Sequence, residues 1–208
     1  IARFPFVRAV MLSGSMSKGV LAKDGDIDFF VITAPGRLWV ARTLLIAFKK
    51  TVLLNSRRDF CVNYFVDTEH LAIEDHNLFT ATEVMTLVPM RGASVCRAFF
   101  AANGWAKEHL PNAGRPCLDR VPDGASRTQR IMEGLLSGRL GETFDRWTMR
   151  LTKERWRRKF PEFDAQRFDL ALRSRRYVSK HHPRNFQEQV LSAYARGLGS
   201  LEVVALCQ

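Results

Sequence analysis

The first third of the chain alternates short apolar runs with turn-forming residues. Three runs rich in β-branched and aromatic side chains cover residues 6–12, 28–33 and 60–66. Such runs, bounded by Gly, Pro, Asn and Ser, predict buried strands. Residues 37–53, between the second and third runs, carry apolar side chains at helical spacing and predict a crossover helix. Strands joined through a helix predict a mixed β-sheet of the α/β type in this part of the chain.

Beyond residue 67 the apolar spacing becomes helical. The expected helices cover residues 69–72, 78–87, 94–109, 127–136, 142–159, 164–174 and 185–197. Residues 111–125 are rich in Pro, Gly and Asp, which is typical of a linker. We therefore expect an α+β protein with a sheet domain at 1–110, a linker at 111–125 and a basic helical region at 126–208.

Aromatic side chains are prominent in the long helix expected at 142–159 and just after it. Phe144, Trp147 and Leu151 form an apolar stripe on that helix. We expect Trp147, Trp156 and Phe160 to pack the helices together rather than to stack on bases.

The charge lies mainly in the helical part of the chain. The formal net charge is +11, and residues 146–184 hold 13 Lys and Arg against 4 Asp and Glu, a net charge of +9. A one-sided excess of this size favours an anionic partner such as a nucleotide, a nucleic acid or a phosphorylated substrate.

Cysteine spacing and hydropathy indicate in which compartment of the cell the protein is expected. Cys61, Cys96, Cys117 and Cys207 form no CxxC pair, so we expect free thiols, a reducing compartment and a cytoplasmic location. Charged residues interrupt the most apolar helical stretch, 38–54, so no membrane partner is expected. The chain starts at Ile1 rather than Met, which is typical of a fragment or of a chain that lacks a short leader.

Two carboxylates open the second expected strand. Asp26 and Asp28 are two residues apart, so on an extended strand their side chains share a face. Paired carboxylates suit Mg²⁺, which completes its coordination with water and substrate phosphate. The preceding turn at Gly14 and Ser15 allows close backbone approach to a phosphate, and Lys18 can offset phosphate charge.

This arrangement resembles the nucleotidyltransferase superfamily, to which DNA polymerase beta belongs. The resemblance rests on a strand that ends in Leu12-Ser13-Gly14-Ser15, followed by a loop and by Asp26-Ile27-Asp28-Phe29 at the start of the next strand. The resemblance covers about the first 67 residues. It implies a nucleoside triphosphate (NTP) held with Mg²⁺ or Mn²⁺ by Asp26, Asp28 and a third carboxylate. It also implies transfer of a nucleoside monophosphate to an acceptor, with release of pyrophosphate.

The sequence departs from the family's pattern at the third carboxylate. Its expected position, in the middle of the third strand, holds Cys61 or Asn63, neither of which can replace a carboxylate base. Asp59 lies on the same face of the strand as these residues and is our candidate for the third carboxylate. The alternative is that Asp59 is an ordinary turn residue. Asp24, in an Asp-Gly pair, is either a further same-face carboxylate or part of a turn.

Basic residues near the C-terminus are further candidates. Lys180, His181, His182 and Arg184 would contact a phosphate or the acceptor, or form an exposed basic turn before a helix. Arg173, Arg175 and Arg176 are either substrate clamps or a solvated surface. Adjacent histidines do not converge on a metal ion, so these are not expected to be zinc ligands.

The leading functional hypothesis is a metal-dependent nucleotidyltransferase whose acceptor is unknown: nucleic acid, small molecule or protein. The alternatives are a catalytically weak nucleotidyltransferase-like module that binds nucleotide or nucleic acid, and a basic helical protein-interaction module. The sequence carries no Walker loop, GxGxxG, GxSxG or HExxH motif, which removes several other enzyme classes.

Overall fold

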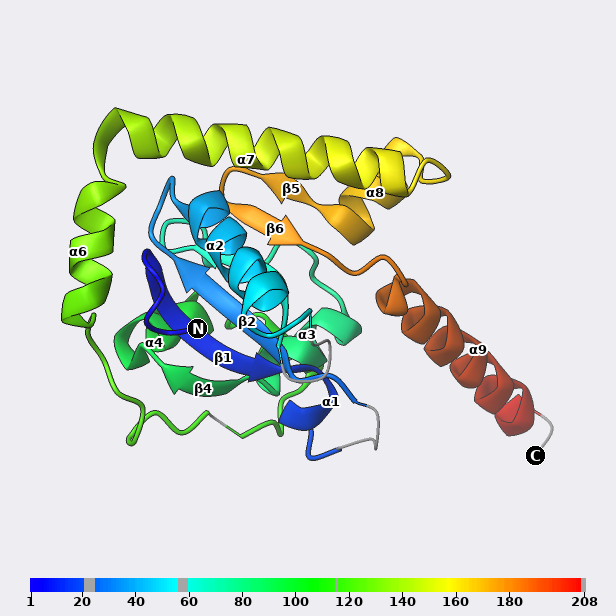
Figure 1. The fold of residues 1–208 in the computed structure, drawn as a ribbon. Coiled ribbons are helices and arrows are strands. Elements are labelled where there is room, and N and C mark those ends of the chain that lie inside the picture. The colour runs from blue at the N-terminus through cyan, green and yellow to red at the C-terminus, as the bar shows by residue number, and fades with distance from the viewer. Residues whose placement is uncertain (21–24, 56–59, 115, 207–208) are drawn as a thin grey trace.

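A six-stranded mixed sheet forms the centre of the molecule (Figure 1). This computed structural model describes residues 1–20, 25–55, 60–114 and 116–206, of which 199–206 through their backbone only. The strands are β1 Val7–Ser13, β2 Asp28–Thr33, β3 Cys61–Asp67, β4 Val88–Arg91, β5 Ser174–Arg175 and β6 Val178–Lys180. Their order is β4-β1-β2-β3-β6-β5, with β2 and β3 parallel and every other neighbouring pair antiparallel.

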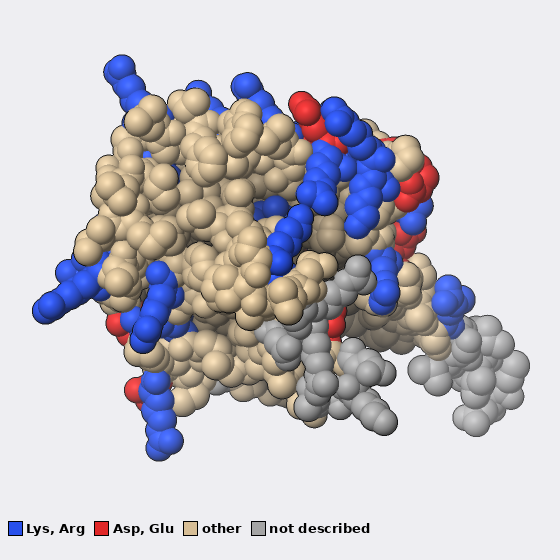
Figure 2. Space-filling model, viewed as in Figure 1, with Lys and Arg blue, Asp and Glu red and all other residues tan. Residues whose placement is uncertain are grey.

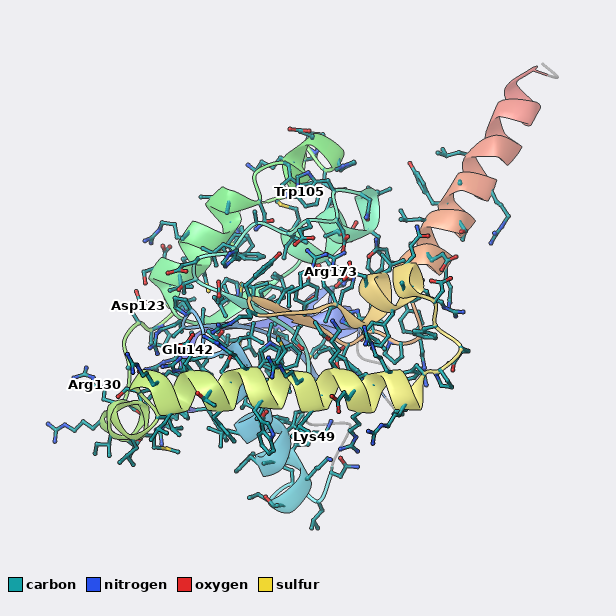
Figure 3. All side chains as sticks on the ribbon, turned by 90° about the horizontal axis from the view of Figure 1, so that it is seen from above. Lys49, Trp105, Asp123, Arg130, Glu142 and Arg173 are labelled. Atoms are coloured by element: carbon teal, nitrogen blue, oxygen red, sulfur yellow. The ribbon has the colours of Figure 1, made fainter. Side chains whose placement is uncertain are left out.

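Helices cover both faces of this sheet. They are α1 Gly14–Ser17, α2 Leu38–Thr51, α3 Leu78–Met85, α4 Ala93–Ala102, α5 Ala106–His109, α6 Arg127–Leu135, α7 Gly138–Lys159, α8 Ala165–Leu172 and α9 Phe186–Leu206. Figure 3 shows α2, with Lys49, on one side of the sheet and the α4–α5 region, with Trp105, on the other. The α+β class predicted from the sequence is confirmed.

Alternating strand residues separate the apolar side chains into two cores. Val31 packs against α2 and α7, whereas its neighbours Phe30 and Ile32 pack on the side of α3 and α4. This alternation follows from the two-residue period of a strand. Trp156 and Leu172 of the C-terminal region belong to the same core as α2, so burial of the sheet depends on both halves of the chain.

Strand β6 also joins the two halves, because it pairs with β3 from Tyr64 to Val66. The residue ranges 1–110 and 126–208 therefore share one sheet and one core. The domain and linker boundaries expected from the sequence stay a prediction.

The three strands expected at 6–12, 28–33 and 60–66 are confirmed as β1, β2 and β3. Three other expectations were wrong. Residues 69–72 form no helix, the helix expected at 94–109 divides at Asn103 into α4 and α5, and residues 126–208 include the strands β5 and β6. Strands β4, β5 and β6 are two to four residues long, so a periodic pattern has no room to develop in them.

The expected packing role of Trp147 was also wrong. Trp147 is 54% exposed and Leu151 is 44% exposed, whereas Trp156 is buried. Helix α7 turns Asp145, Thr148 and Trp156 inward, because Asp145 caps the neighbouring helix α2 and fixes the rotation of α7. Trp147 and Leu151 of the expected apolar stripe consequently face solvent, whereas Phe144 packs against the core.

No helix in the described ranges is long and apolar enough to cross a membrane. Cys61, Cys96 and Cys117 are free thiols, as expected from their spacing. Cys207 lies outside the described residues.

Candidate nucleotide and metal site

Asp28 lies where the end of β1 meets the starts of β2 and β3. Ser13 is opposite Asp28 in the antiparallel pair, and Cys61 is its neighbour in the parallel pair. The chain turns directly after Ser13 through Gly14, whose φ of +71° lies in the left-handed region. A β-carbon at Gly14 would collide with Asp28 Oδ2, so this glycine lets the backbone lie against the carboxylate.

The surroundings of Asp28 hold acids and neutral donors. Asn63 Nδ2 donates to Asp28 Oδ1 at 2.8 Å. Burial raises the pKa of Asp28 above its ordinary value; hydrogen bonds from Cys61 and Asn63 oppose this, and the charges of Asp26 and Glu83 add to it. No Lys, Arg or His of the described ranges lies within ion-pair distance of Asp28.

These donors fit a divalent cation. Asp26 and Asp28 supply hard carboxylate oxygens, and a cation would offset the cost of holding the partly buried Asp28 beside other acids. The described ranges contain no group of three or more His, Cys, Asp and Glu that is able to hold a metal ion. Asp59 and Asp24 lie outside the described residues, so their roles stay a prediction.

The loop after β1 is tied to helix α3. Ser15 is exposed, and Lys18 Nζ donates to Gly14 O at 3.0 Å and to Glu83 Oε1 at 2.8 Å. Lys18 thus lies beside the turn that contacts Asp28, with its charge partly balanced by Glu83. A hollow of about 290 Å³ adjoins this ion pair, with Phe79 of α3 and Tyr194 of α9 in its lining.

Glu83 and Lys49 are the nearby charges that sequence reasoning missed. Glu83 is on α3 and pairs with Lys18. Lys49 is on α2, and its charge lowers the pKa of the Cys61 thiol. Burial and the charge of Asp28 oppose this effect and raise that pKa to about 11. Both belong to helices remote in sequence from the Gly-Ser and Asp-x-Asp motifs. No local pattern marks them.

The candidates near the C-terminus do not form one group. Lys180 is buried in β6 and pairs with Asp75 at 3.1 Å, while Arg184 is exposed. The ring of His181 lies against Trp156, and burial lowers the pKa of His181 to about 3. The ring of His182 lies edge-on to Tyr64, and burial lowers its pKa to about 4. At neutral pH both histidines are uncharged.

The three arginines before them are already paired. Arg173, labelled in Figure 3, is buried and bonds to Asp75 at 2.9 Å, with Glu74 and Asp169 also within ion-pair distance. Arg175 pairs with Glu74 and Asp169, and Arg176 pairs with Glu142. These partners hold the β5–β6 hairpin to its surroundings.

Comparison with known proteins agrees with this arrangement in the N-terminal part. Residues 1–77 match the family model described as "Nucleotidyltransferase domain". The comparison with curated proteins found no match.

One solved structure, described as "Crystal structure of the toxin-antitoxin with AMP-PNP", aligns with 65% of this chain and 90% of its own at 20% identity. Its TM-score of 0.34 is too low to support any statement about fold or ligand. The family match, by contrast, includes β1, the Gly14-Ser15 turn, Asp26, Asp28 and β3. Residues 1–77 of this chain are therefore similar to a nucleotidyltransferase domain.

Proposed function

We propose that the protein transfers a nucleoside monophosphate from an NTP to a hydroxyl-bearing acceptor and releases pyrophosphate. The observation that carries this proposal is the contact between the Gly14 turn and the Asp28 carboxylate. It supports the proposal because the turn that we expect to bind phosphate and the carboxylate that we expect to bind the metal lie at the same end of the inner strands β1 and β2, inside the segment that matches the family model.

Each residue has a distinct task in the proposed reaction. Gly14 and Ser15 bind the β- and γ-phosphates through the turn, and Lys18 contributes positive charge beside it. Asn63 orients Asp28 through its amide hydrogen bond. Asp26 and Asp28 would hold Mg²⁺ or Mn²⁺, which supplies charge stabilisation at the phosphates when it is bound.

The proposed transfer balances as a substitution at phosphorus. An acceptor oxygen bonds to the α-phosphorus, the bond from that phosphorus to the bridging oxygen breaks, and pyrophosphate leaves. The hydroxyl proton has to pass to a base, and we assign that task to Asp59.

Pyrophosphate release from each NTP, with Mg²⁺ or Mn²⁺ and candidate acceptors, tests the proposal. Because Asp26→Asn and Asp28→Asn each remove a ligand carboxylate, either change should reduce release by on the order of 100-fold or more. Glu162→Gln, at an exposed acid away from the site, is the matched control and should retain activity. Release that survives both aspartate substitutions would refute the assignment of the metal site.

Nucleotide binding without turnover is the second candidate. It is favoured by Asn63, which occupies a position on β3 that suits a third carboxylate and donates to Asp28 instead. Calorimetry that shows NTP binding by a protein without pyrophosphate release would support this candidate over transfer.

A further inference from the structure

The outward face of α7 carries a row of cations. Arg139, Arg146, Arg150, Lys153 and Arg157 recur at intervals of three, four or seven residues, which places them on one side of a helix. We call these five residues the α7 cationic row. Within the helix, residues 150–159 alone contain six Lys or Arg and one Glu.

Most of this charge has no acidic partner. Arg146 pairs with Glu142, but throughout the described ranges no acid lies within ion-pair distance of Arg150, Lys153 or Arg157. Figure 2 shows Lys and Arg side chains gathered over the C-terminal half of α7, with few acids among them. Uncompensated charge in such a row raises the local concentration of anions.

An aromatic side chain lies next to the α7 cationic row. Trp147 follows Arg146 and precedes Arg150, and its indole is 54% exposed. Exposed indole rings between cations are the features that proteins use to hold single-stranded nucleic acid, through base stacking and phosphate contacts together. A sulfate-like or small acidic ligand would need neither the length of the row nor the ring.

The positive charge continues from α7 toward the carboxylates. The positive charges of Lys159 at the end of α7 and of Lys49 near the end of α2 both lower the pKa of His181. The charge of Lys49 also lowers the pKa of Cys61, whose thiol forms a hydrogen bond with Asp28. Lys159 and Lys49 therefore connect the C-terminal end of α7 with the surroundings of Cys61 and Asp28, and Figure 3 shows Lys49 on α2, beside α7.

We propose that the acceptor is a single-stranded nucleic acid whose phosphates lie along the α7 cationic row, with a base stacked on Trp147. Its terminal hydroxyl would reach the site through the region of Lys159 and Lys49. The row spans about 27 Å of helix, a length that suits the short segments of roughly 4–16 nucleotides held by single binding modules. This inference rests on the proposed nucleotidyl transfer, whereas the binding surface is testable without it.

The test measures binding separately from turnover. Fluorescence anisotropy of a labelled 12-nucleotide RNA and DNA is recorded over a salt series, with Asp28→Asn protein and no NTP. Three proteins are compared: this background alone, the background with Arg150→Gln, Lys153→Gln and Arg157→Gln, and the background with Arg97→Gln, Lys107→Gln and Arg120→Gln. The last set removes three exposed cations from other surfaces and is the matched control.

Loss of three phosphate contacts should lower the slope of log affinity against log salt by about 2, since each contributes roughly 0.7 with single strands. At 0.1 M salt the same relation gives a loss of about 100-fold in affinity. Trp147→Ala should weaken binding roughly tenfold with an unchanged slope, because stacking releases no counterions. Arg157 also lies over the Phe168 ring, so the melting temperature of the triple variant is measured in parallel.

Equal losses in the row variant and its control, or no binding at all, would overturn the inference. Binding to phosphatidylserine vesicles but not to either oligonucleotide would overturn it in favour of a membrane surface. Pyrophosphate release to another acceptor without oligonucleotide binding would refute this inference alone. Oligonucleotide binding with the expected slope, in a protein that releases no pyrophosphate, would support the surface and refute the proposed transfer.

Discussion

The neutral side chain of Asn63 influences the charge state of the neighbouring Asp28 carboxyl group. Its amide donates to Asp28 at 2.8 Å and opposes the rise in the pKa of that carboxyl group. An aspartate at the same position would instead add a second negative charge beside a carboxylate that has no cation of the described residues within ion-pair distance. The identity of residue 63 therefore decides how strongly the site needs a cation.

The variant Asn63→Asp should make folding depend on a divalent cation. In EDTA the two adjacent carboxylates should lower the free energy of unfolding by about 1–3 kcal/mol. Mn²⁺ should restore most of that loss. Urea unfolding with EDTA and with Mn²⁺ measures both quantities.

Asn63→Ala is the control for this change, because it removes the hydrogen bond without adding charge. It should gain no more stability from Mn²⁺ than the unsubstituted protein does. If Asn63→Asp were destabilised equally with and without Mn²⁺, Asp28 would not belong to a metal site.

At the scale of elements, helix α2 takes its N-terminal cap from another helix. Residue Arg37 offers no side-chain cap; the amides of Trp39 and Val40 instead donate to Asp145 Oδ1 of α7, at 2.8 and 3.0 Å. Asp145 is fully buried, and its Oδ2 has no partner among the described residues. Burial raises the pKa of Asp145 to about 6, although the two amides oppose the rise.

The Asp145 cap predicts a specific pH dependence. The folded protein holds the Asp145 proton more tightly than the unfolded chain, so this residue favours folding at low pH and loses that contribution as pH rises from about 4 to 6. The free energy of unfolding of the protein, minus that of Asp145→Asn, should fall by up to about 3 kcal/mol over this range.

Urea unfolding of both proteins at several pH values between 4 and 7 measures this difference. The Asn side chain keeps an oxygen that accepts from the α2 amides but does not titrate. The Asp145→Asn variant therefore separates the effect of the proton from loss of the cap. A pH-independent difference would show that folding does not raise the pKa of Asp145.

The elements show which parts of the fold were accessible from sequence. Strands β1 to β3 and the Asp26–Asp28 pair were predicted because strong local patterns mark them: apolar runs, a Gly-Ser turn and two carboxylates on one face. The α2 cap, strands β5 and β6, and the Lys18–Glu83 pair depend on residues 65 to more than 100 positions apart. Local periodicity carries no information about such partners.

At the scale of the whole molecule, two partly buried histidines join the two halves of the chain. The backbone N–H of His181 donates to Asn63 O of β3 at 2.9 Å, and the ring of His182 lies edge-on to Tyr64 of β3. Burial lowers the pKa of both rings, further aided by Arg42 at His181 and by Lys180 at His182. Protonation of either ring is therefore costly in the folded state.

Acid should consequently weaken the connection between the halves. A lowered pKa means that the unfolded chain binds protons more readily, so stability is full above about pH 6.5 and is lost as pH falls toward 4. Each ring contributes a slope of up to about 1.4 kcal/mol per pH unit, and the two together outweigh the opposite effect of Asp145.

The variant His181→Phe should reduce this slope by about 1 kcal/mol per pH unit between pH 4.5 and 6, because it keeps a ring against Trp156 but cannot bind a proton. The free energy of urea unfolding against pH measures the slope. His109→Gln, at an exposed histidine, is the matched control and should leave the slope unchanged. An unchanged slope in His181→Phe would show that this ring is protonated equally well in both states.

The pairing of β3 with β6 has a consequence for synthesis on the ribosome. The outer edge of β3 finds its partner at residues 178–180, so the N-terminal segment emerges and collapses with one sheet edge open. Open strand edges are templates for aggregation, and contacts this distant along the chain form slowly. Chains truncated before β6 should therefore bind chaperones or self-associate more than chains that include β6 and α9.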